Sequence, residues 1–229
     1  MKVVVIFSGG IDSSVCLAEA IDKYGYKNVC CLGFNYGQKN IKELESAKKI
    51  ADYYKVNLDI IDISNLFIYS NSSMLNSSNR EIPKISYDEQ VEELNEDEDV
   101  STNVPFRNGL LLSIATSYAI SKNIKIVYYG IHMEAGVAYS LYPDCSKEFN
   151  KAINEAIYVG SGKKVVIEAP LVNLSKREII NIGKCLKVPF ELTWTCYEDG
   201  DKPCLECTAC RDRILAFKEN GMVDPLVGD

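Results

Sequence analysis

Runs of apolar residues alternate with amphipathic stretches along most of this chain. Nearly continuous apolar runs predict five strands, at residues 3–7, 29–35, 56–63, 124–129 and 165–167. Apolar residues spaced three and four apart predict helices in the stretch after residue 14 and over residues 40–55, 107–122 and 175–185. Strands that alternate with helices in this way indicate an α/β fold with a doubly wound parallel sheet.

Ligands of such folds bind at the carboxyl ends of the strands. The segments expected to gather there are residues 8–14, 36–38, 105–108 and 130–144. The helix over residues 175–185 has a clear start signal, because Ser175 is a suitable N-cap and Glu178 completes a capping box.

Residues 64–103 depart from the alternation. They are rich in Asn and Ser and then acidic, with nine Asp or Glu and one Lys between residues 81 and 103. Such a segment is typical of a lid or a disordered loop, and its acidic run at 92–99 is typical of a solvated face. We predict an α/β domain over residues 1–190, with this lid or disordered loop at 64–103, and a small C-terminal subdomain over residues 191–229.

Residues 8–14, Ser-Gly-Gly-Ile-Asp-Ser-Ser, connect the first strand to the first helix. Gly9 and Gly10 allow the backbone to approach an anion closely, and a helix N-terminus offers N–H donors to it. A capped helix after a buried strand is the simpler alternative, but it leaves two glycines and three hydroxyls in seven residues unexplained. The pattern favours nucleotide phosphates, and no Lys follows as in a Walker A loop. The predicted contacts are Phe7, Ser8, Gly9, Gly10, Ile11, Asp12, Ser13 and Ser14.

Four cysteines near the C-terminus have the spacing C-x7-C-x2-C-x2-C, at Cys196, Cys204, Cys207 and Cys210. Four thiolates at such spacing suit a closed tetrahedral Zn²⁺ site. An iron–sulfur cluster uses related spacings, and redox thiols are a third possibility. The other five cysteines, at positions 16, 30, 31, 145 and 185, are expected to be small buried apolar residues.

Composition narrows the functional classes. The net charge of −7 argues against a broad nucleic-acid surface, which needs clustered Lys and Arg. Nine cysteines without a recognisable signal peptide indicate thiols or metal rather than disulfides, and a cytoplasmic location. No apolar stretch is long enough to span a membrane.

Five motifs in order carry a family resemblance. They are residues 8–14, Tyr-Gly-Gln at 36–38, Val-Pro-Phe-Arg-Asn at 104–108, Tyr-Pro-Asp-Cys at 142–145, and Thr-Cys-Tyr at 195–197 ahead of the other cysteines. With these motifs the chain resembles the 7-cyano-7-deazaguanine synthase family, nearly end to end. That family belongs to the pyrophosphate-loop ATP-pyrophosphatase superfamily, so the resemblance implies an adenine nucleotide α-hydrolase-like fold with a zinc-binding knob.

The resemblance also implies a reaction. The carboxylate of 7-carboxy-7-deazaguanine would attack the α-phosphorus of ATP, ammonia would convert the acyl adenylate to an amide, and a second ATP would drive formation of the nitrile. It further implies Mg²⁺ placed by Asp12, structural Zn²⁺ and a homodimer. No nucleophilic side chain is needed, because positioning and charge stabilisation supply the catalysis.

Six residues are expected to contact the deazapurine substrate: Tyr36, Gln38, Arg107, Asn108, Tyr142 and Asp144. Arg107 is also the second catalytic candidate, because a planar guanidinium binds carboxylate or phosphate bidentately. Five of them have a simpler alternative. Arg107 could be an exposed residue at a helix start, Asn108 could cap that helix, and Asp144 could only form a turn. Tyr36 and Tyr142 could be ordinary core or surface residues.

The chain departs from the family pattern where substrate contacts are expected. Lys39 and Asn40 stand where the family has Arg-His, and Ala138, Leu141 and Ser146 replace an acid, a small residue and an Arg. The single His132 is either structural or a proton shuttle. These departures leave open a relative that joins the carboxylate to another amine, such as a protein N-terminus. A pyrophosphate-loop tRNA-modifying enzyme and a nucleotide-sensing module are further alternatives.

Overall fold

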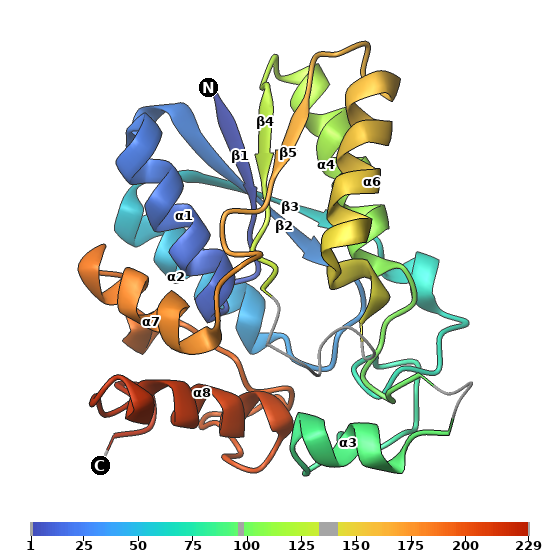
Figure 1. Cartoon of the computed structure of the whole chain (residues 1–229), viewed down its shortest axis with the longest axis vertical. Helices are drawn as coiled ribbons and strands as arrows, with labels where there is room; N and C mark the ends of the chain where they lie inside the picture. Colours follow the sequence, from blue (N-terminus) through green and yellow to red (C-terminus); the bar gives the residue numbers. More distant parts are fainter. Residues whose placement is uncertain (1, 96–98, 133–141, 229) are drawn as a thin grey trace.

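The computed structural model describes residues 2–95, 99–132 and 142–228. Its centre is a five-stranded sheet in the order β3-β2-β1-β4-β5, with every neighbouring pair parallel. The strands are β1 (Val3–Ile6), β2 (Val29–Asn35), β3 (Asn57–Asp62), β4 (Ile126–Tyr128) and β5 (Val166–Glu168). The expected doubly wound parallel sheet is confirmed (Figure 1).

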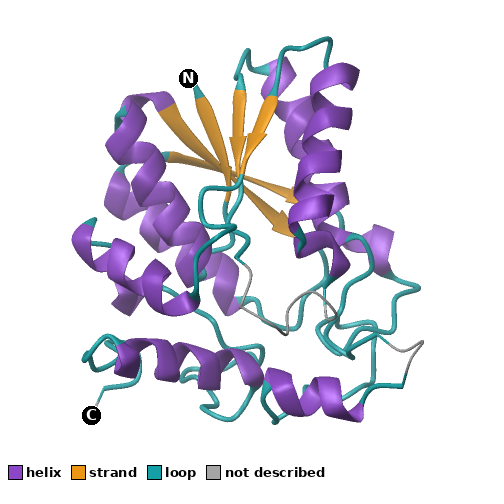
Figure 2. Ribbon diagram, viewed as in Figure 1, coloured by secondary structure: helices purple, strands orange, loops and turns teal. Residues whose placement is uncertain are grey.

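Helices cover both faces of this sheet (Figure 2). One face is covered by α1 (Ile11–Tyr24) and α2 (Lys42–Tyr54), and the other by α4 (Arg107–Ser121) and α6 (Lys147–Gly160). Then α7 (Lys176–Cys185) packs on α1, and α8 (Thr208–Glu219) packs on α7. Single 3₁₀ turns occur at η1 (Tyr26–Asn28), η2 (Ser64–Phe67), η3 (Pro143–Cys145) and η4 (Phe190–Leu192).

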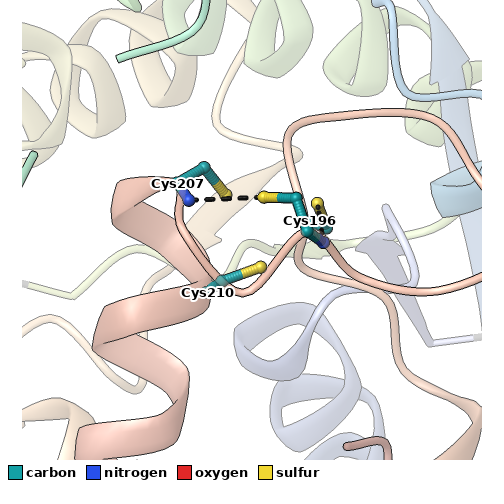
Figure 3. Close-up of side chains that lie close together, drawn as sticks. Cys196, Cys207 and Cys210 are labelled. Atoms are coloured by element: carbon teal, nitrogen blue, oxygen red, sulfur yellow. Dashed lines mark hydrogen bonds between the residues drawn. The ribbon is translucent and has the colours of Figure 1, made fainter. Parts of the chain in front are cut away.

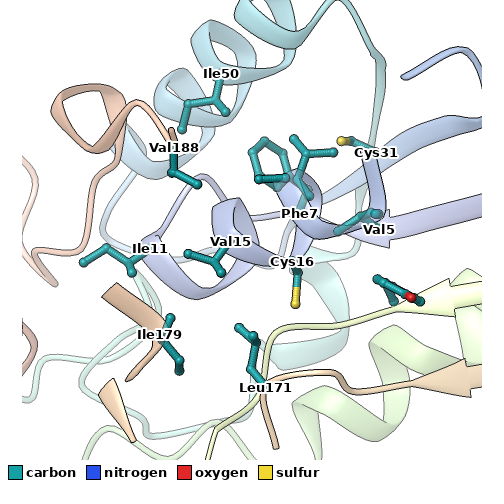
Figure 4. Close-up of a cluster of buried hydrophobic side chains, with 14 of the residues drawn as sticks. Val5, Phe7, Ile11, Val15, Cys16, Cys31, Ile50, Leu171, Ile179 and Val188 are labelled. Carbon is teal, nitrogen blue, oxygen red and sulfur yellow. The ribbon is translucent and has the colours of Figure 1, made fainter. Parts of the chain in front are cut away.

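Two apolar clusters fill the layers on either side of the sheet. Alternation along β1 divides them, since Val3 and Val5 face the α1 side and Val4 faces the α4 side. The α1-side cluster includes Phe7, Val15 and Ile50 (Figure 4). Because both faces of β1 and β2 are buried, their sequences are nearly continuously apolar. The edge strand β3 is partly exposed and carries Asn57, Asp59 and Asp62.

All five expected strands and the four expected helices are present. The first helix begins at Ile11, inside the motif at residues 8–14, and the other predicted ends differ from the observed ones by up to two residues. The capping box is confirmed, because the Ser175 side chain accepts from the Glu178 N–H while the Glu178 carboxylate accepts from the Ser175 N–H. The sequence analysis missed α3 (Tyr87–Glu93), α6 and α8. For α6 a signal was available, since Phe149, Ile153 and Ile157 are spaced by four residues and pack on the core.

The described residues of the segment 64–103 pack against the C-terminal part of the chain. Gln90 on α3 donates to Thr208 Oγ1 at 2.9 Å, and Thr208 in turn donates to the Ile85 carbonyl at 2.8 Å. Thus α3 lies beside the start of α8 (Figure 1). In the acidic run, Glu92, Glu93 and Asp99 are exposed. Among the described residues, no helix is long and apolar enough to cross a membrane.

Candidate functional site

A pocket of about 300 Å³ lies where β1, β2 and β4 end. Its walls combine the loop after β1 with the segments that follow β2 and β4, the segment 64–103, and the C-terminal region from α7 to α8. The predicted site residues that line it are Ser8, Gly10, Ile11, Asp12, Ser13, Tyr36, Arg107, Asn108 and Tyr142. The gathering expected at the carboxyl edge of the sheet is therefore present in the described residues.

The loop between β1 and α1 is braced by its own hydroxyl groups. The Gly10 N–H donates to Ser8 Oγ at 3.2 Å, and Ser8 Oγ lies 3.2 Å from Ser13 Oγ. The Ser14 hydroxyl donates to the Gly10 carbonyl at 2.7 Å and is fully buried. This arrangement leaves Gly10 as the N-cap of α1, whose first turn faces the pocket at Ile11, Asp12 and Ser13. A helix N-terminus in this setting suits an anion.

Asp12 lies between two basic side chains at the pocket wall. Lys176 Nζ is 2.9 and 2.8 Å from its two carboxylate oxygens, and His132 Nδ1 is 3.5 Å from one of them. Burial works against the charged carboxylate, but Lys176 and His132 outweigh it and hold the pKa of Asp12 far below its usual range. Lys176 is also 3.8 Å from Asp212 on α8. The pocket therefore has a cation held by two carboxylates at its loop end.

Arg107 begins α4 and lines the same pocket as this cluster of charges. Its guanidinium donates to Tyr36 Oη at 3.4 Å and lies over the Tyr36 ring at 5.4 Å. Burial disfavours the guanidinium charge, yet Tyr36 and the acidic groups around it raise the pKa of Arg107, so the side chain stays cationic. Glu43, on the first turn of α2, is among the acidic groups that act on it.

Asp144 caps α4 instead of lining the pocket. Its carboxylate accepts from the Asn108 backbone N–H at 2.8 Å and from Asn108 Nδ2 at 3.3 Å. Asn108 Nδ2 also contacts Cys145 Sγ at 3.2 Å. An acid at a helix start complements the helix dipole. Asn108 therefore does not cap α4 itself, because Asp144 supplies the acceptor from outside the helix. The role of both residues toward substrate stays a prediction.

Three tyrosines form a second wall. Tyr87 Oη on α3 is 2.9 Å from Tyr197 Oη, and the Tyr87 ring meets the Tyr142 ring edge-on at 6.4 Å. Tyr142 Oη is 2.6 Å from Thr102 Oγ1. All of these residues line the pocket. Flat aromatic walls of this kind suit a planar heterocycle.

Five predicted site residues do not line the pocket. Phe7 packs in the α1-side core, and Gly9 faces α2. Gln38 braces its own turn, because its Oε1 accepts from the Tyr36 N–H at 2.9 Å. Ser14 and Asp144 make the loop and cap contacts described above. Ala138 and Leu141 lie outside the described residues.

The four C-terminal cysteines form one cluster. Their Sγ atoms all lie within 4.8 Å of one another, and Figure 3 shows Cys207 and Cys210 at the start of α8 facing Cys196. The backbone N–H groups of Cys204 and Cys207 donate to Sγ atoms at 3.3 Å, to Cys196 and Cys204 respectively. Tetrahedral Zn²⁺ with Zn–S of about 2.3 Å places sulfurs roughly 3.8 Å apart, so the geometry fits a four-thiolate metal site.

The expectation that the other cysteines are buried is correct for three of them and wrong for two. Cys16, Cys30 and Cys31 are buried, but Cys185 is exposed and Cys145 is half-buried at the pocket wall. Cys185 is the last residue of α7. Burial raises the pKa of Cys145 to about 12, so its thiol is neutral.

The cysteine cluster is joined to the loop after β1 by short contacts. Asn40 Nδ2 and Trp194 Nε1 both donate to the Cys196 carbonyl, at 2.6 and 3.1 Å. The Trp194 backbone N–H donates to the Gly9 carbonyl at 3.1 Å. Asn40 stands at one of the positions where the chain departs from the family pattern, and it is 3% exposed. Here it acts as a connection between α2 and the metal site.

The sequence analysis missed several residues of the pocket, including Glu43, Lys176, Trp194, Thr195 and Asp212. Glu43 and Lys176 read as ordinary first-turn residues of amphipathic helices. They line the pocket only because α2, α7 and α8 pack around the loop.

Comparison with known proteins covers the whole chain. The family model described as Queuosine biosynthesis protein QueC matches residues 2–221. The 7-cyano-7-deazaguanine synthase of Archaeoglobus fulgidus is 44% identical over 230 residues, spanning 100% of this chain and 91% of that protein. The synthase of the same name from Caldicellulosiruptor saccharolyticus is 41% identical over 227 residues, spanning 99% and 95%. A solved NMN synthetase from Francisella tularensis aligns over 96% of this chain and 77% of that chain, with TM-score 0.49 and 15% identity.

Proposed function

This chain belongs to the queuosine biosynthesis protein QueC family, and on that basis we propose that it is an ATP-dependent carbon–nitrogen ligase acting on 7-carboxy-7-deazaguanine. The proposed sequence is adenylation of the carboxylate, amide formation with ammonia, and a second ATP-dependent step that yields 7-cyano-7-deazaguanine. The observation that carries the proposal is that the glycine loop and the Arg107 guanidinium open into one pocket.

The loop end of this pocket suits the triphosphate. Backbone N–H groups in the first turn of α1 would receive phosphate oxygens, and the Lys176 ammonium, 2.8 Å from Asp12, would offset the charge that develops on leaving pyrophosphate. Asp12 and Asp212 provide the hard oxygen ligands that Mg²⁺ takes together with phosphates. When bound, Mg²⁺ would neutralise phosphate charge at this end of the pocket.

The part of the pocket around Arg107 suits the deazapurine carboxylate. Arg107, held on the Tyr36 ring, would orient that carboxylate toward the α-phosphorus by its planar fork. Tyr87, Tyr142 and Tyr197 would enclose the flat ring system and exclude water. Positioning two bound reactants converts the reaction to an intramolecular one, so no covalent enzyme intermediate is required.

Zinc is the metal that we propose for the cysteine cluster, in a structural role. Four thiolates leave no open coordination position for chemistry. The cluster also stands outside the pocket, since none of its four cysteines is among the residues that line it. The homodimer expected from the family resemblance remains a prediction, as do cytoplasmic location and a protein acceptor.

Product analysis tests the proposed function. Purified protein is incubated with ATP, Mg²⁺, 7-carboxy-7-deazaguanine and ammonium, and products are identified by mass spectrometry. We expect the nitrile together with AMP and pyrophosphate, and none of them from an Asp12→Asn preparation that controls for contaminating ATPases. Products that stop at the adenylate or the amide would favour the relative that conjugates another amine. No ATP turnover with this substrate would contradict the proposal.

A further inference from the structure

Glu43 is a pocket carboxylate to which the proposed mechanism gives no role. It lies on the first turn of α2 and lines the pocket together with Ser8, Gly10 and Arg107. The side chain is half-buried. A negative carboxylate beside a loop that suits phosphates would repel the phosphate charge. Its presence there suggests that it takes part in the reaction. Its surroundings therefore need an explanation.

The position of Glu43 is fixed by tight backbone packing. The Glu43 N–H donates to Asn40 Oδ1 at 3.2 Å. A Cβ added at Gly9 would lie 2.5 Å from the Glu43 carbonyl oxygen, which shows how closely this turn of α2 approaches the loop. Glu43 Oε1 is 3.6 Å from the place of a Cβ on Gly10. The carboxylate is thus held directly beside the start of α1.

Groups from three elements face this carboxylate. Ser8 of the loop, Arg107 of α4 and Tyr36 after β2 all interact with it. Burial raises the pKa of Glu43 to about 7, although the Ser8 hydroxyl and the Arg107 charge act in the opposite direction. Among the described residues, no ion pair joins Glu43 to Arg107. Such a carboxylate can take up a proton at neutral pH.

Resting on the proposed function, we infer that Glu43 is the general base that takes a proton from ammonium as nitrogen enters the acyl adenylate. Ammonium and the Glu43 carboxylate give ammonia and the Glu43 carboxylic acid. Ammonia forms the C–N bond at the acyl carbon, and the C–O bond to AMP breaks. The second nitrogen proton passes to the released AMP phosphate or to water, which leaves the neutral amide.

The location of Glu43 favours the nitrogen over the metal or the phosphates. In the proposed function, the acyl carbon stands between the loop, which holds the α-phosphate, and Arg107, which orients the carboxylate. Glu43 lines the pocket beside Gly10 and acts electrostatically on Arg107, so its carboxylate faces this same position. A carboxylate there also attracts the ammonium cation.

Two partial reactions separate this role from adenylation. ATP–pyrophosphate exchange with 7-carboxy-7-deazaguanine reports adenylate formation, and amide plus nitrile formed in a single turnover reports nitrogen transfer. The variants are Glu43→Gln and the matched control Glu45→Gln, which removes an exposed carboxylate from the same helix turn. Thermal unfolding by circular dichroism establishes that both variants are folded.

We expect Glu43→Gln to keep pyrophosphate exchange within about threefold of the parent protein and to slow nitrogen transfer from ammonium by about 10²-fold at pH 7, the usual contribution of a general base. The deficit should shrink at pH 9, where free ammonia is more abundant, and with hydroxylamine, which is largely unprotonated at neutral pH. Glu45→Gln should leave both reactions unchanged.

Three results would overturn the inference. An equal loss of exchange and nitrogen transfer would place Glu43 on ATP or Mg²⁺, and unchanged nitrogen transfer would remove it from the reaction. If Glu43→Gln does not fold, the pH dependence of the parent protein tests the inference instead. A rate of nitrogen transfer that does not increase as the pH rises through 7 would exclude Glu43 as the base. Absence of exchange in the parent protein contradicts the proposed function itself, and so is distinguishable from failure of Glu43 alone.

Discussion

At the residue scale, Gly9 is required by space as well as by backbone conformation. Its φ is +89°, and a Cβ there would lie 2.5 Å from both the Ala47 nitrogen and the Glu43 carbonyl oxygen. Gly25 offers a matched comparison, since its φ is +78° but nothing lies within 4 Å of an added Cβ. The pair separates backbone strain from steric overlap.

We predict that Gly9→Ala destabilises the fold much more than Gly25→Ala. Strain alone should cost Gly25→Ala about 2 kcal/mol, because its φ of 78° and ψ of 139° lie outside the left-handed helical region. Gly9→Ala must also push α2 away from the loop and should cost about 4 kcal/mol or more. Urea unfolding at pH 7 measures the difference, and calorimetric titration with ATP should show weaker binding for Gly9→Ala alone. Equal destabilisation in the two variants would mean that α2 shifts freely.

At the element scale, the turn that leads into α2 connects the loop to the metal site. Asn40 serves both, because its Nδ2 donates to the Cys196 carbonyl at 2.6 Å and its Oδ1 accepts from the Glu43 N–H at 3.2 Å. The Cys196 carbonyl keeps a second donor in Trp194 Nε1. Removing the Asn40 side chain should therefore weaken the attachment of α2 and leave the four cysteines in place.

We predict that Asn40→Ala lowers the free energy of unfolding by about 2 kcal/mol, because the buried Cys196 carbonyl and the partly buried Glu43 N–H each lose a partner. The metal content should stay at that of the parent protein, while ATP affinity falls about tenfold, equivalent to about 1.4 kcal/mol. Elemental analysis and calorimetric titration measure the two quantities. Asn57→Ala, which removes an exposed side-chain contact to Asp59, is the control. If Asn40→Ala loses metal, the cysteine cluster depends on Asn40, and the prediction that only α2 and ATP binding are affected is wrong.

At the scale of the whole molecule, the C-terminal region closes the pocket that the sheet begins. Trp194, Thr195, Tyr197, Ala209 and Asp212 all line it. Buried Arg213 holds this region together, because its guanidinium binds both carboxylate oxygens of Asp224 at 2.6 and 2.8 Å and donates to Thr193 Oγ1 at 2.8 Å. The metal site and this ion pair thus support one wall of the pocket.

We predict that metal removal by a chelator exposes Trp194, the only tryptophan of the chain and 3% exposed in the fold. Its emission should shift to longer wavelength, and the melting temperature should fall by about 10 °C, because a tightly bound ligand adds about 4 kcal/mol. Added Zn²⁺ should reverse both changes. If the emission of Trp194 does not change when the metal is removed, Trp194 is held in place by the α/β domain alone.

Elements that depend on residues close together in the sequence could be predicted, whereas contacts between distant residues could not. The strands and the helices with apolar spacing follow from local periodicity, and the Ser175 and Glu178 capping box is a contact across three residues. The cysteine spacing likewise indicated one metal site, which the clustered Sγ atoms support. The short helix α3 has no such period, because its acidic residues face solvent and its contacts go to Tyr142, Tyr197 and the start of α8.

By itself, the sequence determined the α/β class, the loop between β1 and α1, and the cysteine cluster, because each depends on residues that are close along the chain. Only the tertiary structure decided which side chains surround the loop. Lys176 is 164 positions from Asp12 and lies 2.8 Å from its carboxylate, and Asn40 is 156 positions from Cys196. Such pairs leave no local pattern, since the polar residues that begin α2 and α7 are ordinary at helix starts. The packing of these helices on the carboxyl edge of the sheet turns them into a site.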